Sequence, residues 1–427
     1  MREPPSDVLI LLTDDHRADA LGCAGHPLLR TPNIDRLASE GTRFENAFVT
    51  TAICCASRAA ILTGQYNRRN GIHEFNVPLT PAQHAASYPG RLRSAGYRIG
   101  YVGKYGVGDG HPPPADRYDY WRGFAGQGVY ETPAGHLTDV MTRQAVEFLE
   151  TGDQRPSCLC VAYKAPHAED LDPRQYIPAP RHRDSLADGS VPAVRSDDFD
   201  RLPPYLRTSE GRVRWQARFA TPSARDASVR DILRLIAGVD ESVGAIVETL
   251  RRTRRLDRTL IVFLGDNGAF LGEHGLADKW TLHEESARVP CIVRDPRAPE
   301  GARGRVRSEM ALNIDIAPTV LEAAGLRPDR AMQGRSLLPL AHGHSPAWRT
   351  DWFYEHLFRH PGIPRSEGVR TTTHAYWRFI DKPAPNEFCH DLRVDPEEVV
   401  NLAGSPAHAA LVAKLRARTA EYARSLA

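Results

Sequence analysis

A cysteine and an arginine stand four residues apart where a helix is predicted to begin. Residues 57–62 favour helix and Gly64 can end it, so Cys54 lies at or just before the amino-terminal turn. The free N–H groups of such a turn attract negative charge, and Arg58 adds a fixed cation one turn further on. The pair could therefore mount a thiol nucleophile for an anionic substrate. The alternative is a buried cysteine on an ordinary core helix.

Two other segments end in groups of oxygen ligands. Asp14 and Asp15 follow one apolar run, and Asp266 and Asn267 follow another. Three carboxylates and one amide suit Ca²⁺ or Mg²⁺ and are a poor match for zinc or copper. Taken singly, each group could be a plain turn or a helix cap. If they meet in space, they predict a divalent-cation site.

Four further side chains could bind oxyanions next to such a cation. Arg58, Lys104, His167 and Lys279 can each donate to the oxygens of an anionic substrate. A divalent cation with several such donors fits a tetrahedral dianion or an ester monoanion, because the metal polarises the substrate and the donors stabilise charge.

The elements that must position these residues alternate along the chain. Short apolar runs, typical of strands buried on both faces, cover residues 8–12, 98–103, 158–163 and 259–265. Helical patterns lie between them, at 31–41 with Thr31 as the capping residue and at 229–250. This alternation predicts an α/β domain with a mostly parallel sheet flanked by helices, in which ligands gather at the carboxyl ends of the strands. The polar residues that follow these strands should therefore lie close together.

The motifs also occur in a recognisable order. A cysteine, a serine–arginine pair and a Leu-Thr-Gly helix end stand at 54, 57–58 and 62–64, and further motifs stand at 14–15, 103–104, 165–167, 265–268, 272–280, 284–290, 391–398 and 401–402. In these motifs the chain resembles the type I sulfatases of the alkaline phosphatase superfamily, over nearly its full length. That family carries the signature Cys-x-Pro-Ser-Arg.

The resemblance implies an alkaline-phosphatase-like fold and a specific chemistry. It implies that a maturation enzyme oxidises Cys54 to formylglycine, which acts as nucleophile and metal ligand. Asp14, Asp15, Asp266 and Asn267 would hold the metal, usually calcium, with magnesium as an option. Two roles remain for the cations: Arg58 and Lys104 would orient and polarise the nucleophile, while His167 and Lys279 would bind sulfate and assist the leaving oxygen. Lys104 would also contact the substrate.

Two positions depart from the family pattern. Ala56 replaces the signature proline, in a segment that the maturation enzyme reads as an extended chain. The family often carries Gly-Lys-Trp-His, in which the histidine is a candidate base, but here Gly106 takes that place. His73, Tyr105 and His111 are nearby in sequence as replacements.

The chain divides into a predicted catalytic domain at 1–343 and a small carboxyl-terminal α+β domain at 344–427. Within the first, 168–228 is rich in Pro, Asp and Arg and is predicted to form a long excursion or lid. The second is predicted to contain an antiparallel sheet with strands at 352–356 and 375–380 and a helix from about 406 to 425. Substrate contacts are expected from His356, and stacking on a sugar from neighbouring aromatics such as Tyr354 and Trp377, with core packing as the alternative for the aromatics.

Composition excludes some partners. With 55 Lys+Arg against 53 Asp+Glu, the chain lacks the concentrated basic charge that nucleic acid or an acidic membrane surface requires. Seven cysteines without dense regular spacing do not predict a disulfide framework. No apolar run could cross a bilayer, and the first residues leave no room for a signal peptide, so a cytoplasmic location is expected for the chain as written, or a periplasmic or secreted one if a leader was removed.

Three functions fit these features. The first is a formylglycine-dependent sulfatase that acts on a sulfate ester, expected to be that of a carbohydrate. The substrate could be a small molecule or an oligosaccharide. The second is a phosphonate monoester or phosphodiester hydrolase that uses the same site. The third is a catalytically silent protein in which Cys54 stays unmodified and the pocket only captures sulfated ligands.

Overall fold

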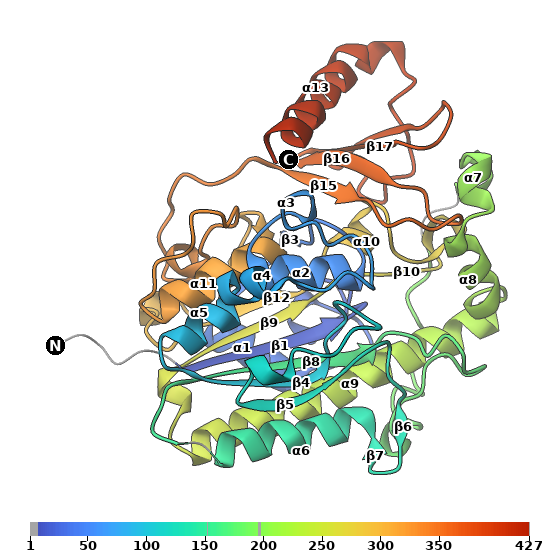
Figure 1. Ribbon diagram of the computed structural model, residues 1–427. Helices are drawn as coiled ribbons and strands as arrows, with labels where there is room; N and C mark the ends of the chain where they lie inside the picture. The colour runs from blue at the N-terminus through green and yellow to red at the C-terminus, as the bar shows by residue number, and fades with distance from the viewer. Residues whose placement is uncertain (1–6, 152, 195–197, 427) are drawn as a thin grey trace.

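The computed structural model describes residues 7–151, 153–194 and 198–426 and is built on an eight-stranded sheet with helices on both faces (Figure 1). The expectation about a leader rests partly on residues 1–6, which lie outside the described residues. In the sheet order β13-β2-β12-β9-β1-β8-β4-β5, the strands are β13 (Arg305–Arg307), β2 (Thr42–Phe44), β12 (Cys291–Arg294), β9 (Thr259–Gly265), β1 (Asp7–Asp14), β8 (Ser157–Pro166), β4 (Arg98–Lys104) and β5 (Tyr120–Phe124).

The five strands β9, β1, β8, β4 and β5 run parallel and include all four predicted strands. Along β1, Val8, Ile10 and Leu12 pack into one core layer, whereas Leu9 and Leu11 pack into the other. Because both faces are buried, such strands read as continuous apolar runs. The predicted α/β fold with a mostly parallel sheet is confirmed. Strand β12 is the exception, since it is antiparallel to both β9 and β2.

Each face of the sheet is covered by its own set of helices (Figure 1). One face packs against α1 (Pro32–Glu40), α6 (Leu137–Glu150) and α9 (Pro222–Arg252), and the other against α2 (Cys54–Thr63), α5 (Tyr88–Ser94) and α11 (Ile316–Ala323). Helix α9 contains the predicted helix at 229–250 and begins seven residues earlier. Its apolar stripe faces the core as expected.

The expectation that Thr31 caps helix α1 is wrong. Its side chain makes no capping hydrogen bond and donates instead to Asp35 Oδ1 at 2.8 Å. The first-turn N–H of Ile34 donates to Oδ1 of Asp240 in α9 at 2.8 Å, and that of Asn33 donates to Oδ2 at 3.3 Å. A carboxylate from a distant helix therefore satisfies the N–H groups that a local cap would satisfy.

The segment 168–228 is partly helical, and its residues 195–197 lie outside the described residues. It contains α7 (Pro204–Arg207) and α8 (Glu210–Arg218) and ends in the first turns of α9. Helix α8 packs beside strand β11 (Ala277–Asp278), on the right of Figure 1. Part of the segment is therefore packed, and Phe219, just after α8, is 3% exposed.

A second, antiparallel sheet forms the carboxyl-terminal part, at the top of Figure 1. Its strands are β15 (Asp351–His356), β16 (Ser366–Thr371), β17 (His374–Phe379) and β18 (Glu387–Asp391), and α13 (Ala409–Ser425) packs on β16 and β17. The expected antiparallel sheet and final helix are confirmed, but the sequence did not predict β16 or β18. The division at residues 343 and 344 stays a prediction.

Shorter elements connect these parts. They include the strand pairs β3 (Ala47–Phe48) with β14 (Ala311–Leu312), β6 (Glu131–Thr132) with β7 (Gly135–His136) and β10 (Phe270–Leu271) with β11, and the helices α3 (Asn67–Asn70), α4 (Pro81–Ala86), α10 (Glu284–Ala287) and α12 (Leu338–Ala341). Among the described residues, no helix combines the length and apolar character needed to span a membrane. All seven cysteines are described and free, so the expectation of no disulfide framework is confirmed.

Candidate active site

The sheet register brings the predicted metal ligands together. Thr13 of β1 pairs with Gly265 of β9, so the next residues, Asp14 at the end of β1 and Asp266 just after β9, lie side by side. The backbone N–H of Asp15 donates to Asp266 Oδ1 at 3.3 Å, and Asn267 Nδ2 donates to Asp15 Oδ1 at 2.6 Å. Asp15 has a left-handed backbone with φ of 59°, which turns its carboxylate back toward its neighbours. All four side chains are buried.

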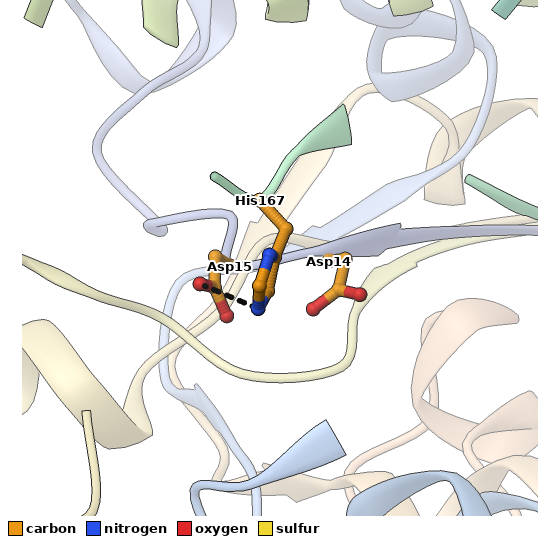
Figure 2. Close-up of side chains that lie close together, drawn as sticks. All are labelled: Asp14, Asp15 and His167. Carbon is orange, nitrogen blue, oxygen red and sulfur yellow. Dashed lines mark ion pairs between the residues drawn. The ribbon is translucent and has the colours of Figure 1, made fainter. Parts of the chain in front are cut away.

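The same group of ligands fits a divalent cation. Two of its oxygens, Asp14 Oδ1 and Asn267 Oδ1, are buried and have no hydrogen-bond partner among the described residues. Buried polar atoms without a partner are costly, so a ligand role explains them. Ligand atoms of Asp14, Asp15 and His167 lie within 4.8 Å of one another, and Figure 2 shows both carboxylates beside the imidazole. Oxygen-rich sites of this kind suit calcium or magnesium.

Three cations face these three carboxylates. Arg58 Nε donates to Asp266 Oδ2 at 2.7 Å, and its Nη2 lies 3.4 Å from Asp14 Oδ2. The ammonium of Lys104 donates to Asp14, and that of Lys279 donates to Asp15. Positive and negative side chains therefore balance, and a bound divalent cation would leave the pocket with net positive charge. Such a pocket attracts an anion.

The pKa values of the carboxylates differ with their partners. Burial alone would raise the pKa of Asp14, but the cations Lys104 and Arg58 outweigh it and hold this pKa well below its usual range. Burial raises the pKa of Asp15 and of Asp266, with nearby carboxylates adding to the effect. The pKa values of Asp15 and Asp266 are raised in part because several carboxylates lie close together. A bound divalent cation would reduce this repulsion.

Cys54 is the first residue of α2, as the sequence indicated. The preceding Ile53 cannot cap the helix with its side chain, and Gly64 ends it in the left-handed conformation with φ of 67°. Cys54 is 1% exposed, and burial raises the pKa of its thiol, although Lys104 and Lys279 lie close enough to oppose that effect. The helix start and two ammonium groups thus converge on this position.

His167 follows the end of β8 and is 5% exposed. Its Nδ1 donates to the carbonyl of Ala168 at 2.6 Å, which leaves Nε2 without a proton on the neutral ring. Nε2 lies 3.7 Å from Asp15 Oδ2, the pair joined by the dashed line in Figure 2. Burial lowers the pKa of His167 well below its usual value. The ring is thus held neutral at the pocket.

The residues of the carboxyl-terminal sheet that were expected to contact substrate are all fully buried. His356 is fully buried in β15, and neither ring nitrogen has a hydrogen-bond partner among the described residues. Its predicted contact with substrate stays a prediction. Tyr354 and Trp377 are also 0% exposed, and Trp377 stacks on Phe388 at 5.1 Å, so both pack in the core rather than line an open surface.

The three candidate replacements for the histidine whose place Gly106 takes lie in different environments. Tyr105 packs against Tyr101 and Trp121 in the core, and burial raises the pKa of its hydroxyl above the usual value, so it is poorly suited to accept a proton. His111 is exposed. His73 is partly buried, and burial lowers its pKa.

The structure adds residues that sequence reasoning missed. Gln127, in the loop after β5, accepts a hydrogen bond from Lys104 Nζ at 2.5 Å. A Cβ at Gly106 would meet Arg58 Cδ at 3.1 Å and Lys104 Cε at 3.7 Å, so this glycine leaves space directly beside both cations. No motif marked Gln127, because its partner is 23 residues away and on another strand.

Family models match nearly the whole chain. The Sulfatase family model matches residues 6–326, and the model for the N-sulphoglucosamine sulphohydrolase carboxyl-terminal region matches residues 272–425. The N-acetylglucosamine-6-O-sulfatase of Bacteroides thetaiotaomicron is 31% identical, over 94% of this chain and 83% of that protein. The human N-acetylglucosamine-6-sulfatase is 28% identical, over 93% and 81%.

Solved structures share the fold. A protein solved in complex with its substrate D-glucosamine-2-N,6-O-disulfate superposes with a TM-score of 0.84 at 27% identity, covering 99% of this chain and 98% of that chain. The phosphonate monoester hydrolase of Agrobacterium radiobacter superposes with a TM-score of 0.80 at 21% identity, covering 99% and 96%. The latter likeness shows the fold alone.

Proposed function

The chain belongs to the sulfatase family and is a sulfuric ester hydrolase, and we propose that it cleaves a sulfate ester of a carbohydrate, using a calcium ion and a formylglycine made from Cys54. The relatives support the carbohydrate part of this proposal. One is named for the 6-O-sulfate of N-acetylglucosamine, and one structure holds a sulfated glucosamine as its substrate. A 6-O-sulfated glucosamine unit is therefore the first substrate to test.

The metal site is proposed to consist of Asp14, Asp15, Asp266, Asn267 and the modified residue 54. The two unpartnered oxygens, Asp14 Oδ1 and Asn267 Oδ1, are the observation that carries the proposal. A calcium ion, or magnesium in its place, would supply Lewis acid polarisation of the substrate's oxygens. Lys104 and Arg58 hold the pKa of Asp14 well below its usual range, so this carboxylate is ionised and ready for a cation.

The nucleophile is proposed to be formylglycine because the unmodified thiol is poorly activated. Burial raises the pKa of Cys54, and a neutral thiol is a weak nucleophile. The hydrated aldehyde of formylglycine would supply one hydroxyl to attack sulfur, and deprotonation of its second hydroxyl would then re-form the C=O bond and release inorganic sulfate with the first oxygen. A formylglycine-generating maturation enzyme is the partner that this chemistry requires.

Four further side chains are proposed to orient the nucleophile, bind sulfate and assist the leaving oxygen. Lys104, at the end of β4, and Arg58, in α2, are proposed to orient the nucleophile, with Lys104 also binding sulfate. Lys279 donates to Asp15 and is proposed to turn its other N–H groups toward a sulfate oxygen and the leaving oxygen. His167, with Nδ1 bonded to a carbonyl, presents an unprotonated Nε2 to the pocket, where it could take the proton of the attacking hydroxyl and pass it to the leaving oxygen.

Parallel assays test the proposal. Protein produced together with a formylglycine-generating enzyme is tested on N-acetylglucosamine 6-sulfate, an aryl sulfate, a phosphodiester and a phosphonate monoester. We expect the sulfate esters to be the preferred substrates, with the sugar ester hydrolysed. Phosphonate turnover well above sulfate turnover would replace the proposal with the second function.

Mass spectrometry of the peptide that contains Cys54 tests the modification separately. We expect the formylglycine mass or that of its hydrate. A persistent thiol in the presence of the maturation enzyme, together with sulfate-ester binding but no turnover, would identify a silent binding protein.

A further inference from the structure

Lys279 lies between two residues with unusual backbone conformations. Asp278 has φ of 62° and Trp280 has φ of 88°, both in the left-handed region. This region is unfavourable for residues that carry a Cβ, so such a pair persists only where the surroundings hold it. The conformation presents the Lys279 ammonium to Asp15 in the pocket while the Asp278 side chain points to a different set of partners.

Those partners are two arginines of helix α8. Asp278 is 3% exposed; its Oδ1 accepts a hydrogen bond from Arg218, and its Oδ2 accepts one from Arg214 Nη1 at 2.6 Å. The same arginines bind Asp170, through Arg218 Nη2 to Oδ1 at 2.6 Å and Arg214 Nη1 to Oδ2 at 3.1 Å. We name Asp170, Arg214, Arg218 and Asp278 the α8 clamp. It joins the segment after His167, helix α8 and strand β11.

Charge and burial make this clamp stiff. The side chain of Arg218 is 2% exposed, and its Nε also donates to Gln175 at 2.8 Å. Burial alone would raise the pKa of Asp278, but Arg218 and Arg214 outweigh it and hold this pKa well below its usual range. Hydrogen bonds between ionised groups are short and directional, so they fix the Asp278 side chain more firmly than neutral contacts would.

We propose that the α8 clamp positions Lys279 for the reaction, with Asp278, Arg214 and Arg218 as positioning residues. The inference rests on the proposed function, in which Lys279 binds sulfate and assists the leaving oxygen. Without the clamp, the left-handed turn at Asp278 relaxes and the ammonium moves away from the pocket. Misplacement by about 1 Å costs on the order of 10²-fold in rate.

The test uses two esters with different leaving groups. Asp278→Asn keeps the shape of the side chain but removes its charge, and Arg218→Lys keeps the charge but removes the forked contact. We expect each to lower kcat/KM for N-acetylglucosamine 6-sulfate by about 10- to 100-fold. The loss on 4-nitrophenyl sulfate should be several-fold smaller, because a weakly basic leaving group needs little help.

Helix α8 offers a matched control. Arg212 lies on the same helix, but its guanidinium stacks 3.9 Å from the ring of Trp215 and 4.0 Å from that of Phe199 and donates to Gly275 O. Arg212→Gln should therefore leave both kcat/KM values within about twofold. An equal loss on both esters in the clamp variants, or the same selective loss in Arg212→Gln, would show a general structural effect and overturn the proposal.

A double mutant separates this proposal from the proposed function. If the clamp acts through Lys279, Asp278→Asn should have almost no further effect on kcat/KM in a Lys279→Ala background. An undiminished further loss would overturn the positioning role while leaving the role of Lys279 intact. Wild-type kinetics for Lys279→Ala alone would overturn the role of Lys279 and the clamp with it.

The affinity for inorganic sulfate tests the proposal without any turnover. The Kd of inorganic sulfate, measured by calorimetry on the calcium-loaded protein, should rise at least about threefold in Arg218→Lys and stay unchanged in Arg212→Gln. An unchanged Kd in Arg218→Lys, in protein whose circular dichroism matches the wild type, would count against the proposal.

Discussion

The two sheets of this protein differ in the partners of their buried polar side chains. At the carboxyl edge of the eight-stranded sheet, Asp14, Lys104 and Arg58 are buried against one another as charges. In the four-stranded sheet, His356 and Trp377 are buried just as deeply, yet their partners are aromatic rings such as Phe358 and Phe388. Both regions also contain ring or carboxylate atoms without a hydrogen-bond partner among the described residues.

This difference shows what identifies a reactive site. An unpartnered buried atom alone does not, because Trp377 Nε1 and both nitrogens of His356 are as isolated as Asp14 Oδ1. What distinguishes the first region is that its isolated oxygens face other ligands and cations at the ends of parallel strands. The isolated atoms of His356 and Trp377 instead lie among aromatic rings, which is typical of a core.

Cys54→Ala should have the largest effect. The substitution removes the proposed nucleophile, so we expect kcat/KM for a sulfate ester to fall by at least about 10⁴-fold, while the free energy of unfolding changes by about 1 kcal/mol. Cys55→Ala is the matched control, since Cys55 packs with Trp280 and Ile363 in a separate apolar cluster. Similar activity in the two variants would contradict a covalent role for Cys54.

Asp14→Asn tests the metal site by stability rather than by rate. Calcium at a hundredfold excess over its Kd should stabilise the wild type by about 2.7 kcal/mol, and this stabilisation should disappear in the variant. Differential scanning calorimetry with and without calcium measures it. Asp240→Asn removes a buried carboxylate that accepts from the first turn of α1 rather than from the predicted ligands, and it should keep the calcium response. A full calcium response in Asp14→Asn would place the ion elsewhere.

His356→Phe tests the second region through pH. Burial lowers the pKa of His356 to about 3, so the unfolded chain takes up a proton first as the pH falls below 6.5. The stability contributed by the neutral ring is complete above that pH and is lost below it, by about 2 kcal/mol at pH 5. The variant should lose less stability between pH 7 and pH 5 and keep kcat/KM within about threefold. A large rise in KM would instead support the predicted substrate contact.

Ala56→Pro should have the smallest effect on the folded protein. Position 56 is in the first turn of α2, where a missing N–H breaks no helical hydrogen bond, although Cys55 must then precede a proline. We expect the stability to change by about 1 kcal/mol and the fraction of formylglycine, measured by mass spectrometry, to rise. An unchanged fraction would show that alanine is read as well as proline.

The sequence revealed the first region more completely than the second. Its strands are buried on both faces, so they appear as apolar runs, and the polar residues that follow them must meet at one edge. Strand β16 gave no such signal, because its buried Glu367 and Arg370 are matched by Arg68 and Glu284 from distant segments. Ion pairs of this kind cannot be read from local periodicity.

Long-range partners also explain the other omissions. Asp240 replaces Thr31 as the cap of α1 from another helix, and Gln127 reaches Lys104 from the loop after β5. The clamp on Asp278 depends on arginines some 60 residues earlier in the chain. In each case the side chain is unremarkable in sequence, and only the packing of separate elements gives it a role.

Helix α2 imposes an order of events on the making of this enzyme. All ten of its residues are buried, and Cys54 is 1% exposed, so another protein cannot reach this residue once the chain has folded. On the proposed mechanism, oxidation of Cys54 must therefore come before folding, and a chain that buries α2 first would keep its thiol and stay inactive. Conditions that slow folding or raise the level of the maturation enzyme should increase the active fraction without changing the turnover of each active molecule.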